Sequence, residues 1–136
     1  MKSKIVADGD LRLRRDEKFK ARLSPVPIDA ALRAVVTGSG SVSAVLAGTK
    51  LSITGSFDGM QSPATLAQVR LGAATGVRGP AIGDLTFSHA PSGDITGTLN
   101  LTAEQTEGLR KGKLYIQIDS EKASDGNLWG WLLKLG

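Results

Sequence analysis

The sequence predicts an all-β fold: an antiparallel, Greek-key-like β-sandwich or barrel of about eight strands with one short crossover helix. Three observations lead to this prediction. Hydrophobic and polar residues alternate along most of the chain, which is the period of a half-buried strand. The 17 glycines among 136 residues suit a chain with many tight turns. Only one segment carries the signals of a helix start and stop.

The expected strands follow the alternating segments in chain order. Phe19 and Leu23 alternate with basic residues, and Pro25 ends this first strand. The next two strands form a hairpin around the turn AGTK, and the first of them reaches back to Leu32 through a bend at Gly38–Gly40. A later hairpin closes around the turn APSG. The expected strands are 18–23, 32–37 with 41–47, 51–57, 65–71, 84–89, 94–101, 113–119 and 127–134.

The single expected helix starts at Thr102. The segment TAEQ is a capping box, in which the Thr102 side chain and the Gln105 side chain each bond to the other residue's backbone N–H. Gly112 is expected to end the helix after residues 103–111. Because strands flank it on both sides, the helix is expected to be a crossover connection.

Length and charge divide the chain into a charged N-terminal extension, residues 1–17, and one β domain, residues 18–136. A domain of this size buries a core without disulfides or structural metals. The whole net charge of +4 falls in residues 1–22, where eight basic residues face four acidic ones. Phe19 is the one aromatic residue of that segment, so the interleaved basic and aromatic pattern of a nucleic-acid site is missing. We expect no nucleic-acid binding.

Targeting signals are also missing from the sequence. No apolar run approaches the ~20 residues that a membrane-spanning helix needs. The opening segment MKSKIVADGD lacks the apolar core of a secretory signal peptide. The chain has no cysteine, which excludes disulfides, zinc–thiolate sites and thiol nucleophiles but leaves the compartment open. We expect no membrane span, and either a cytosolic protein or the mature form of an exported one.

No catalytic constellation is visible. His89 is the sole histidine and precedes the turn APSG, where an exposed hairpin residue is expected, and no serine lies in a GxSxG motif. The closest carboxylates, Asp119, Glu121 and Asp125, lack the spacing of a calcium-binding loop. We expect a protein that is not an enzyme and has no cofactor. A hydrolase that uses carboxylates alone is the alternative that sequence spacing leaves open.

The segment NLWGWLLKLG holds both tryptophans of a chain with only six aromatic residues (two Trp, one Tyr and three Phe). Side chains alternate across a strand, so Asn127, Trp129, Trp131 and Leu133 are expected to share one face. Three interpretations stay open at this point. The indoles contact a partner, or the extension with its LRLRR segment lies across them through cation–π contacts, or they fill the core.

The order of segments resembles that of the chordin-type (CHRD) domain. The resemblance covers about residues 18–134 and includes KFKARL, GSFDGM, GP…DL at 79–85 and DGNLWGWLLK. Its most specific part is the block GTLNLTAEQ…LRKGKLYIQI. The resemblance implies a β-rich module of this length that is found outside the cytoplasm, in the periplasm or the extracellular space.

The resemblance also implies a cluster of histidines at one end of the domain, as a metal or polar site, and this sequence lacks those histidines. Gln68 and Arg70 stand where the family typically has two of them, and Asp119 stands where it has a third. Asn127 and Trp129 replace a glutamate and an arginine. Amides and guanidinium groups are poor metal ligands, so we expect that the metal site is lost. An Arg70–Asp119 salt bridge is expected in its place.

The expected function is that of a non-catalytic binding or accessory module. It would dock on a partner protein, or on a second copy of itself, through the tryptophan-bearing C-terminal strand. The alternative is a small-ligand or carbohydrate-binding module, in which the indoles stack on sugar rings and Asn127, Gln117 and Asp119 supply polar contacts. By resemblance the protein is periplasmic or secreted. The expected site residues are Trp129, Trp131, Asn127, Arg70, Gln68 and Asp119, with no metal and no cofactor.

Overall fold

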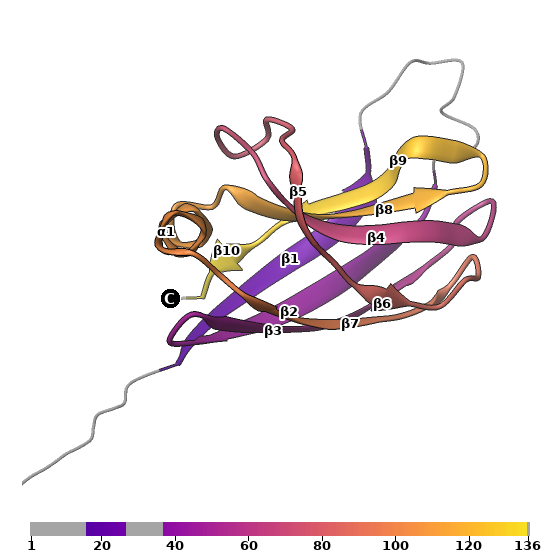
Figure 1. Cartoon of the computed structure of the whole chain (residues 1–136). Coiled ribbons are helices and arrows are strands. Elements are labelled where there is room, and N and C mark those ends of the chain that lie inside the picture. The colour runs from indigo at the N-terminus through magenta and orange to yellow at the C-terminus, as the bar shows by residue number, and fades with distance from the viewer. Residues whose placement is uncertain (1–15, 27–36, 136) are drawn as a thin grey trace, which may run out of the picture.

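The strands form a single antiparallel sheet that curls into a nearly closed barrel (Figure 1). A computed structural model describes residues 16–26 and 37–135. Nine strands follow one another in the order β5-β4-β8-β9-β1-β2-β3-β7-β6, and β10 pairs with β1. The strands are β1 (Glu17–Pro25), β2 (Ser39–Ala47), β3 (Lys50–Asp58), β4 (Ala64–Leu71), β5 (Ala81–Asp84), β6 (Thr86–Phe87), β7 (Gly93–Asn100), β8 (Leu114–Ser120), β9 (Ala123–Trp131) and β10 (Leu133–Lys134).

The two ends of the sheet meet where β5 gives way to β6. β5 pairs with β4, β6 pairs with β7, and the Leu85 N–H between them donates to the Ala67 carbonyl of β4 (2.9 Å). This contact brings the first and last strands of the sheet together. The all-β prediction is therefore confirmed, and of the two architectures that the sequence left open the structure shows the barrel.

The core lies inside the barrel because alternate residues of each strand point inward. In β1 the residues Phe19, Ala21 and Leu23 are buried, and the residues between them are exposed. The same period of two runs through β2 and β3. The largest fully buried side chains of the core cluster are Phe19, Leu23, Leu46, Leu51, Ile53, Ile95, Leu109, Leu114, Ile116, Ile118 and Leu128.

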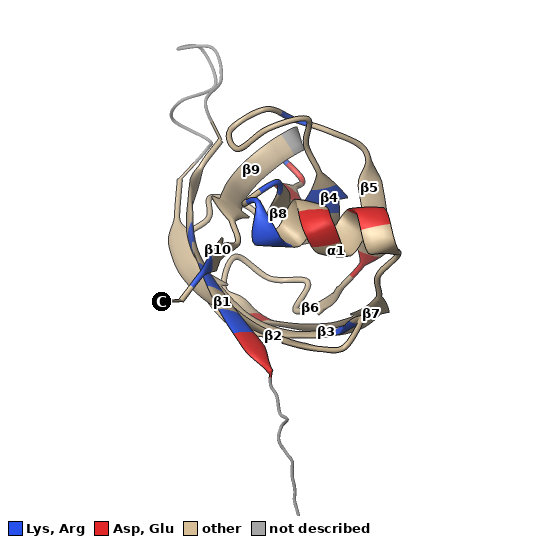
Figure 2. Ribbon diagram, turned by 90° about the vertical axis from the view of Figure 1, so that its left-hand side faces the viewer, with Lys and Arg blue, Asp and Glu red and all other residues tan. Residues whose placement is uncertain are grey.

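Helix α1 (Ala103–Arg110) lies across one end of the barrel (Figure 2). The predicted capping box is confirmed: the Gln105 N–H donates to Thr102 Oγ1 (3.1 Å), and the Thr102 N–H donates to Gln105 Oε1 (3.0 Å). Leu109 points into the core and is fully buried. Gly112 follows the helix with a φ of +75°, a left-handed conformation that favours glycine.

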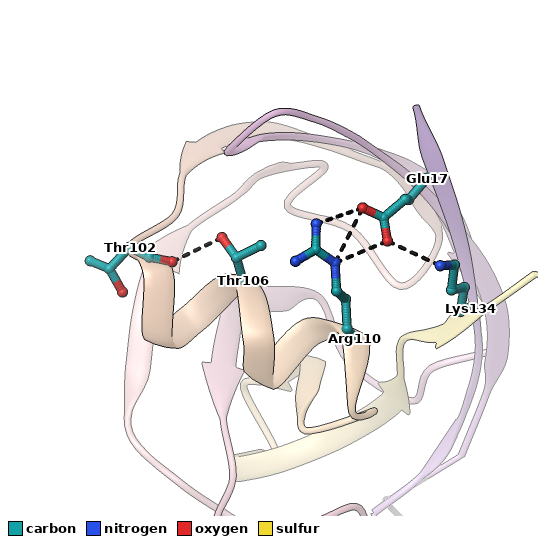
Figure 3. A network of polar contacts seen from close by, with 5 residues as sticks. All are labelled: Glu17, Thr102, Thr106, Arg110 and Lys134. Atoms are coloured by element: carbon teal, nitrogen blue, oxygen red, sulfur yellow. Dashed lines mark hydrogen bonds and ion pairs between the residues drawn. The ribbon is translucent and has the colours of Figure 1, made fainter. Parts of the chain in front are cut away.

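An ionic network joins the helix to the two strands beside it (Figure 3). Arg110, in the last turn of α1, donates to both carboxylate oxygens of Glu17, with a shortest distance of 2.7 Å from Nη2 to Oε2. Lys134 Nζ of β10 lies 3.1 Å from Glu17 Oε1. These contacts hold the pKa of Glu17 at about 2, below its ordinary value of 4.5, chiefly through the hydrogen bond from Arg110. Glu17, assigned above to the charged extension, is thus the first residue of the barrel.

The strand boundaries differ from the prediction in three places. There are ten strands among the described residues rather than about eight: the segment predicted as 84–89 holds only the short strand β6 and the last residue of β5, and most of β5 lies before it. The segment predicted as 127–134 is also divided: the Leu132 N–H bonds to the Leu114 carbonyl of β8, and β10 then turns to β1. The expected strand at 32–37 and the LRLRR segment fall largely or wholly outside the described residues. No helix in the described part of the chain is long and apolar enough to cross a membrane.

Candidate functional site

The candidate site is the outer face of β4, β8 and β9. Two rows of side chains cross these strands in register. Arg70 lies opposite Tyr115, which lies opposite Trp131. Gln68 lies opposite Gln117, which lies opposite Trp129. Four of the six predicted site residues are therefore neighbours on one surface: Trp129, Trp131, Arg70 and Gln68.

Three aromatic rings form the centre of this face. The Trp131 ring lies 4.3 Å from the Tyr115 ring, centroid to centroid, and the Trp129 ring meets Tyr115 edge-on at 5.8 Å. The two indoles are 5.5 Å apart in a T-shaped arrangement. Tyr115 is fully buried, whereas both tryptophans are partly exposed. The indoles thus pack on Tyr115 and remain partly exposed.

Tyr115 is buried on the outside of the barrel because residues 72–80, here called the strap, fold back over β8. The Gly79 N–H donates to Tyr115 Oη (2.9 Å), and Tyr115 Oη donates to the Gly79 carbonyl (3.2 Å). Thr75 Oγ1 donates to the Gly112 carbonyl (2.7 Å) at the other end of the strap. A Cβ on Gly79 would clash with the Leu71 carbonyl, so the strap needs glycine there.

The strap also adds residues to the site that the sequence reasoning missed. Arg78 lies over the Trp129 ring, with its guanidinium carbon 6.0 Å from the ring centroid. Val77, which precedes Arg78 in the strap, is 48% exposed, a large value for an apolar residue. The available signal was the glycine-rich segment between two strands, GAATGVRGPAIG, whose length allows it to fold over a neighbouring strand.

The predicted Arg70–Asp119 salt bridge is wrong. Arg70 lies opposite Tyr115, and Asp119 is four residues further along β8, about 13 Å away at ~3.3 Å per residue. The Arg70 guanidinium instead donates to the Gly79 carbonyl (Nη1, 3.0 Å) and to Gln68 Oε1 (Nη2, 3.3 Å). Gln68 in turn donates to Asp84 Oδ1 (3.0 Å). Arg70 therefore fastens the strap to β4 and is held between uncharged acceptors.

Asn127 was expected to share the face of the tryptophans, and a bulge in β9 turns it elsewhere. The register of β8 and β9 shifts between Ile118 and Ser120, so several residues of β9 oppose one residue of β8. Asn127 is fully buried, accepts a hydrogen bond from Ser120 Oγ (2.7 Å) and donates to the Thr37 carbonyl (2.8 Å). Its amide is a structural link between β8, β9 and the start of β2.

Asp119 and Gln117 lie beneath the surface of the site. Gln117 Nε2 donates to Asp119 Oδ1 (2.9 Å), and the two residues are only 4% and 7% exposed. Gln117 Oε1 and Arg70 Nε are buried and make no hydrogen bond with the residues that the structure describes. Because Gln117 and Asp119 are buried, they support the site from below and are out of reach of a ligand that binds to the indoles.

The described residues hold no group of three or more His, Cys, Asp or Glu side chains arranged to bind a metal ion. His89 packs its ring against Phe87 at a centroid distance of 4.3 Å. Among the described residues, the large apolar side chains that are exposed are Val77 in the strap and, beyond the end of β9, Leu133 and Leu135 (both 52% exposed).

These features define a β-barrel module whose distinctive chemistry lies on an outer strand surface. The CHRD domain family model matches residues 19–132, and the chain belongs to this family. Membership suggests a non-enzymatic binding module, and the family is typically extracellular or periplasmic. Searches of the curated proteins and of the solved structures found no match.

Proposed function

We propose that this CHRD domain docks on a partner protein, or on a second copy of itself, through the outer face of β9. The observation that carries this proposal is the tryptophan pair: two indoles in mutual contact, each partly exposed, on the outer side of the barrel wall. Tryptophan is the residue most enriched among those that dominate binding energy at protein interfaces.

The site is organised before any partner arrives. Tyr115 fixes both indoles from below, and the strap fixes Tyr115 through two hydrogen bonds at Gly79. A partner therefore does not have to immobilise these side chains, which otherwise costs about 0.5–1.5 kcal/mol for each flexible side chain. Val77 extends the apolar surface, and Arg78 supplies a polar rim beside Trp129.

The geometry favours a protein partner over a sugar at the tryptophan pair. A sugar stacked on an indole needs polar groups beside the ring that bond its hydroxyl groups. The amide of Asn127 is committed to Ser120 and Thr37, and Gln117 and Asp119 bond to each other below the surface. The polar partners expected for a sugar are therefore engaged inside the protein, while the exposed part of the site is aromatic and aliphatic.

The test captures partners from the native source with the tagged protein, and measures self-association of the purified chain by light scattering. The informative variant is Val77→Asp, because Val77 is exposed and its replacement leaves the Tyr115 stack in place. Ser92→Asp, in the exposed turn between β6 and β7, introduces the same charge away from the site. Thermal unfolding of both variants checks that the fold is retained.

A stoichiometric companion, or a dimer, that is present with the wild type and with Ser92→Asp and lost with Val77→Asp supports the proposal. We expect at least about a tenfold loss of affinity for Val77→Asp and a similar loss for Trp129→Ala. A companion retained by both site variants places the interface elsewhere and overturns the proposal. A strictly monomeric chain without a companion overturns it too.

A further inference from the structure

A groove of about 640 Å³ lies on β1 and the start of β2, next to the tryptophan strand. On one side of β1, Ser24 pairs with Trp129 of β9. On the other side of β1, Arg22 pairs with Ser41 of β2. The groove therefore begins where the candidate docking face ends, and it is a separate surface. Its lining residues are Lys20, Ala21, Arg22, Leu23, Ser24, Pro25, Gly38, Ser39, Gly40, Ser41 and Ser56.

The described residues that line the groove carry only positive charge. Lys20 and Arg22 are exposed on β1, and neither forms an ion pair with a described carboxylate. No acidic residue is among these described lining residues. The nearest acids in the strand register are Asp58, opposite Ser39, and Asp94, opposite Ser56. The positive edge of the groove is thus on β1, and its opposite edge borders acidic side chains. Figure 2 shows the basic residues along β1.

Between these edges the groove presents hydroxyl groups. Ser24, Ser39, Ser41 and Ser56 belong to the lining, and a serine hydroxyl both donates and accepts hydrogen bonds. The Ser39 hydroxyl donates to Asp58 Oδ1 (3.4 Å), so towards a ligand it acts as an acceptor. A complementary ligand carries a negative group at one end and several hydroxyl groups beside it. The described part of the lining has no aromatic side chain on which a nucleic-acid base would stack.

We infer that this groove binds an acidic saccharide, a sugar chain that bears carboxylate or sulfate groups. Arg22 and Lys20 bind the anionic group at the β1 edge, where a guanidinium fits a carboxylate or a sulfate with two parallel hydrogen bonds. The serines bond to the hydroxyl groups of the ring that carries it. The saccharide's neutral side faces the acids of β3 and β7, which repel a second anionic group. The inference is independent of protein docking at the tryptophan pair, because it uses none of those residues.

The test measures the binding of three fluorescently labelled probes at physiological ionic strength: oligogalacturonate, which carries carboxylates, dextran sulfate, and neutral dextran. The site variant is Lys20→Ser/Arg22→Ser, which removes both charges from exposed positions. The matched control is Lys50→Ser/Lys122→Ser, which removes two exposed lysines outside the groove. A third variant, Ser41→Phe, fills the groove and leaves the net charge unchanged.

We expect saturable binding of at least one acidic probe, at least about tenfold weakened in Lys20→Ser/Arg22→Ser and in Ser41→Phe, and unchanged in the control. The comparison of oligogalacturonate with dextran sulfate identifies the anionic group. Equal losses in the site variant and the control indicate non-specific attraction and overturn the inference. Equal binding of neutral dextran, or of a single-stranded oligonucleotide, overturns it as well. Retention of the protein companion by the site variant shows that the two surfaces act separately.

Discussion

Replacing Glu17 by glutamine removes the centre of the network that joins β1, α1 and β10. The Glu17 side chain is 20% exposed, and it contacts Arg110 and Lys134 at 2.7 and 3.1 Å. A lowering of its pKa from 4.5 to about 2 sets an upper limit of about 3.4 kcal/mol, at 1.36 kcal/mol per pH unit. The two cationic side chains are 44% and 53% exposed, so solvent screening reduces the expected contribution to about 1–2 kcal/mol.

The sign of the pH dependence follows from the direction of the pKa change. The carboxylate of Glu17 has a lower pKa in the folded chain than in the unfolded chain, so its ionisation favours folding. This contribution is fully present above about pH 4.5 and is lost as the pH falls towards about 2. Below that range the wild type and Glu17→Gln are expected to be equally stable, apart from small differences between the acid and the amide.

The assay is urea unfolding followed by tryptophan fluorescence, at pH 7 and at intervals down to pH 2, on the wild type and on Glu17→Gln. The difference between their unfolding free energies isolates Glu17 from the other carboxylates. Glu107→Gln is the control, since Glu107 lies 3.9 Å from Lys111 and both are more than half exposed. That control should change stability by no more than about 0.5 kcal/mol. The reasoning is refuted if the difference between the unfolding free energies of the wild type and Glu17→Gln stays constant from pH 7 to pH 2.

Four further variants test local features of the fold. Thr102→Ala removes the side-chain oxygen that accepts from the Gln105 N–H and should lower the unfolding free energy by about 1 kcal/mol, measured by urea unfolding. Tyr115→Phe removes both strap hydrogen bonds at Gly79; we expect about 1 kcal/mol of destabilisation and faster hydrogen exchange of the Gly79 amide, and an unchanged exchange rate would contradict the role of the hydroxyl. Gly40→Ala forces a Cβ against the neighbouring strand and should destabilise by at least about 2 kcal/mol in thermal unfolding. Gly48→Ala meets no neighbouring atom and should cost about 1 kcal/mol through its φ of +66° alone.

Local sequence signals were sufficient for most of the fold. The strands around Phe19, Val42 and Ile53 alternate because one face fills the barrel, and alternation is visible in the sequence. The helix was predictable because both bonds of the capping box join Thr102 and Gln105, which are three residues apart in the sequence. Closure of the barrel was not predictable in this way, since it depends on a contact between strands that are distant in the sheet order.

The sequence indicated part of the candidate site and none of its contacts. Trp129 was expected there from alternation and Gln68 from the family resemblance, and the register places both beside Gln117. The alternation of side chains does not predict the position of Asn127, because the bulge in β9 places extra residues opposite a single residue of β8. The local sequence does not show where along β9 this bulge occurs. The Arg70 contacts were missed for a different reason: its partner at Gly79 belongs to the strap, whose path over β8 is decided by tertiary packing.

The strap explains how one strand face can be both structural and available for binding. Every residue of β8 is buried, those that point inward by the core and those that point outward by the strap and the indoles. Tyr115 therefore anchors Trp129 and Trp131 from a second, outer layer of packing, without drawing them into the barrel. Because both indoles remain partly exposed while this layer orders them, a partner can bind them at little additional cost in side-chain ordering. A substitution that loosened the strap would thus weaken docking even though it touched no partner, and Tyr115→Phe is the variant in which these two effects can be compared.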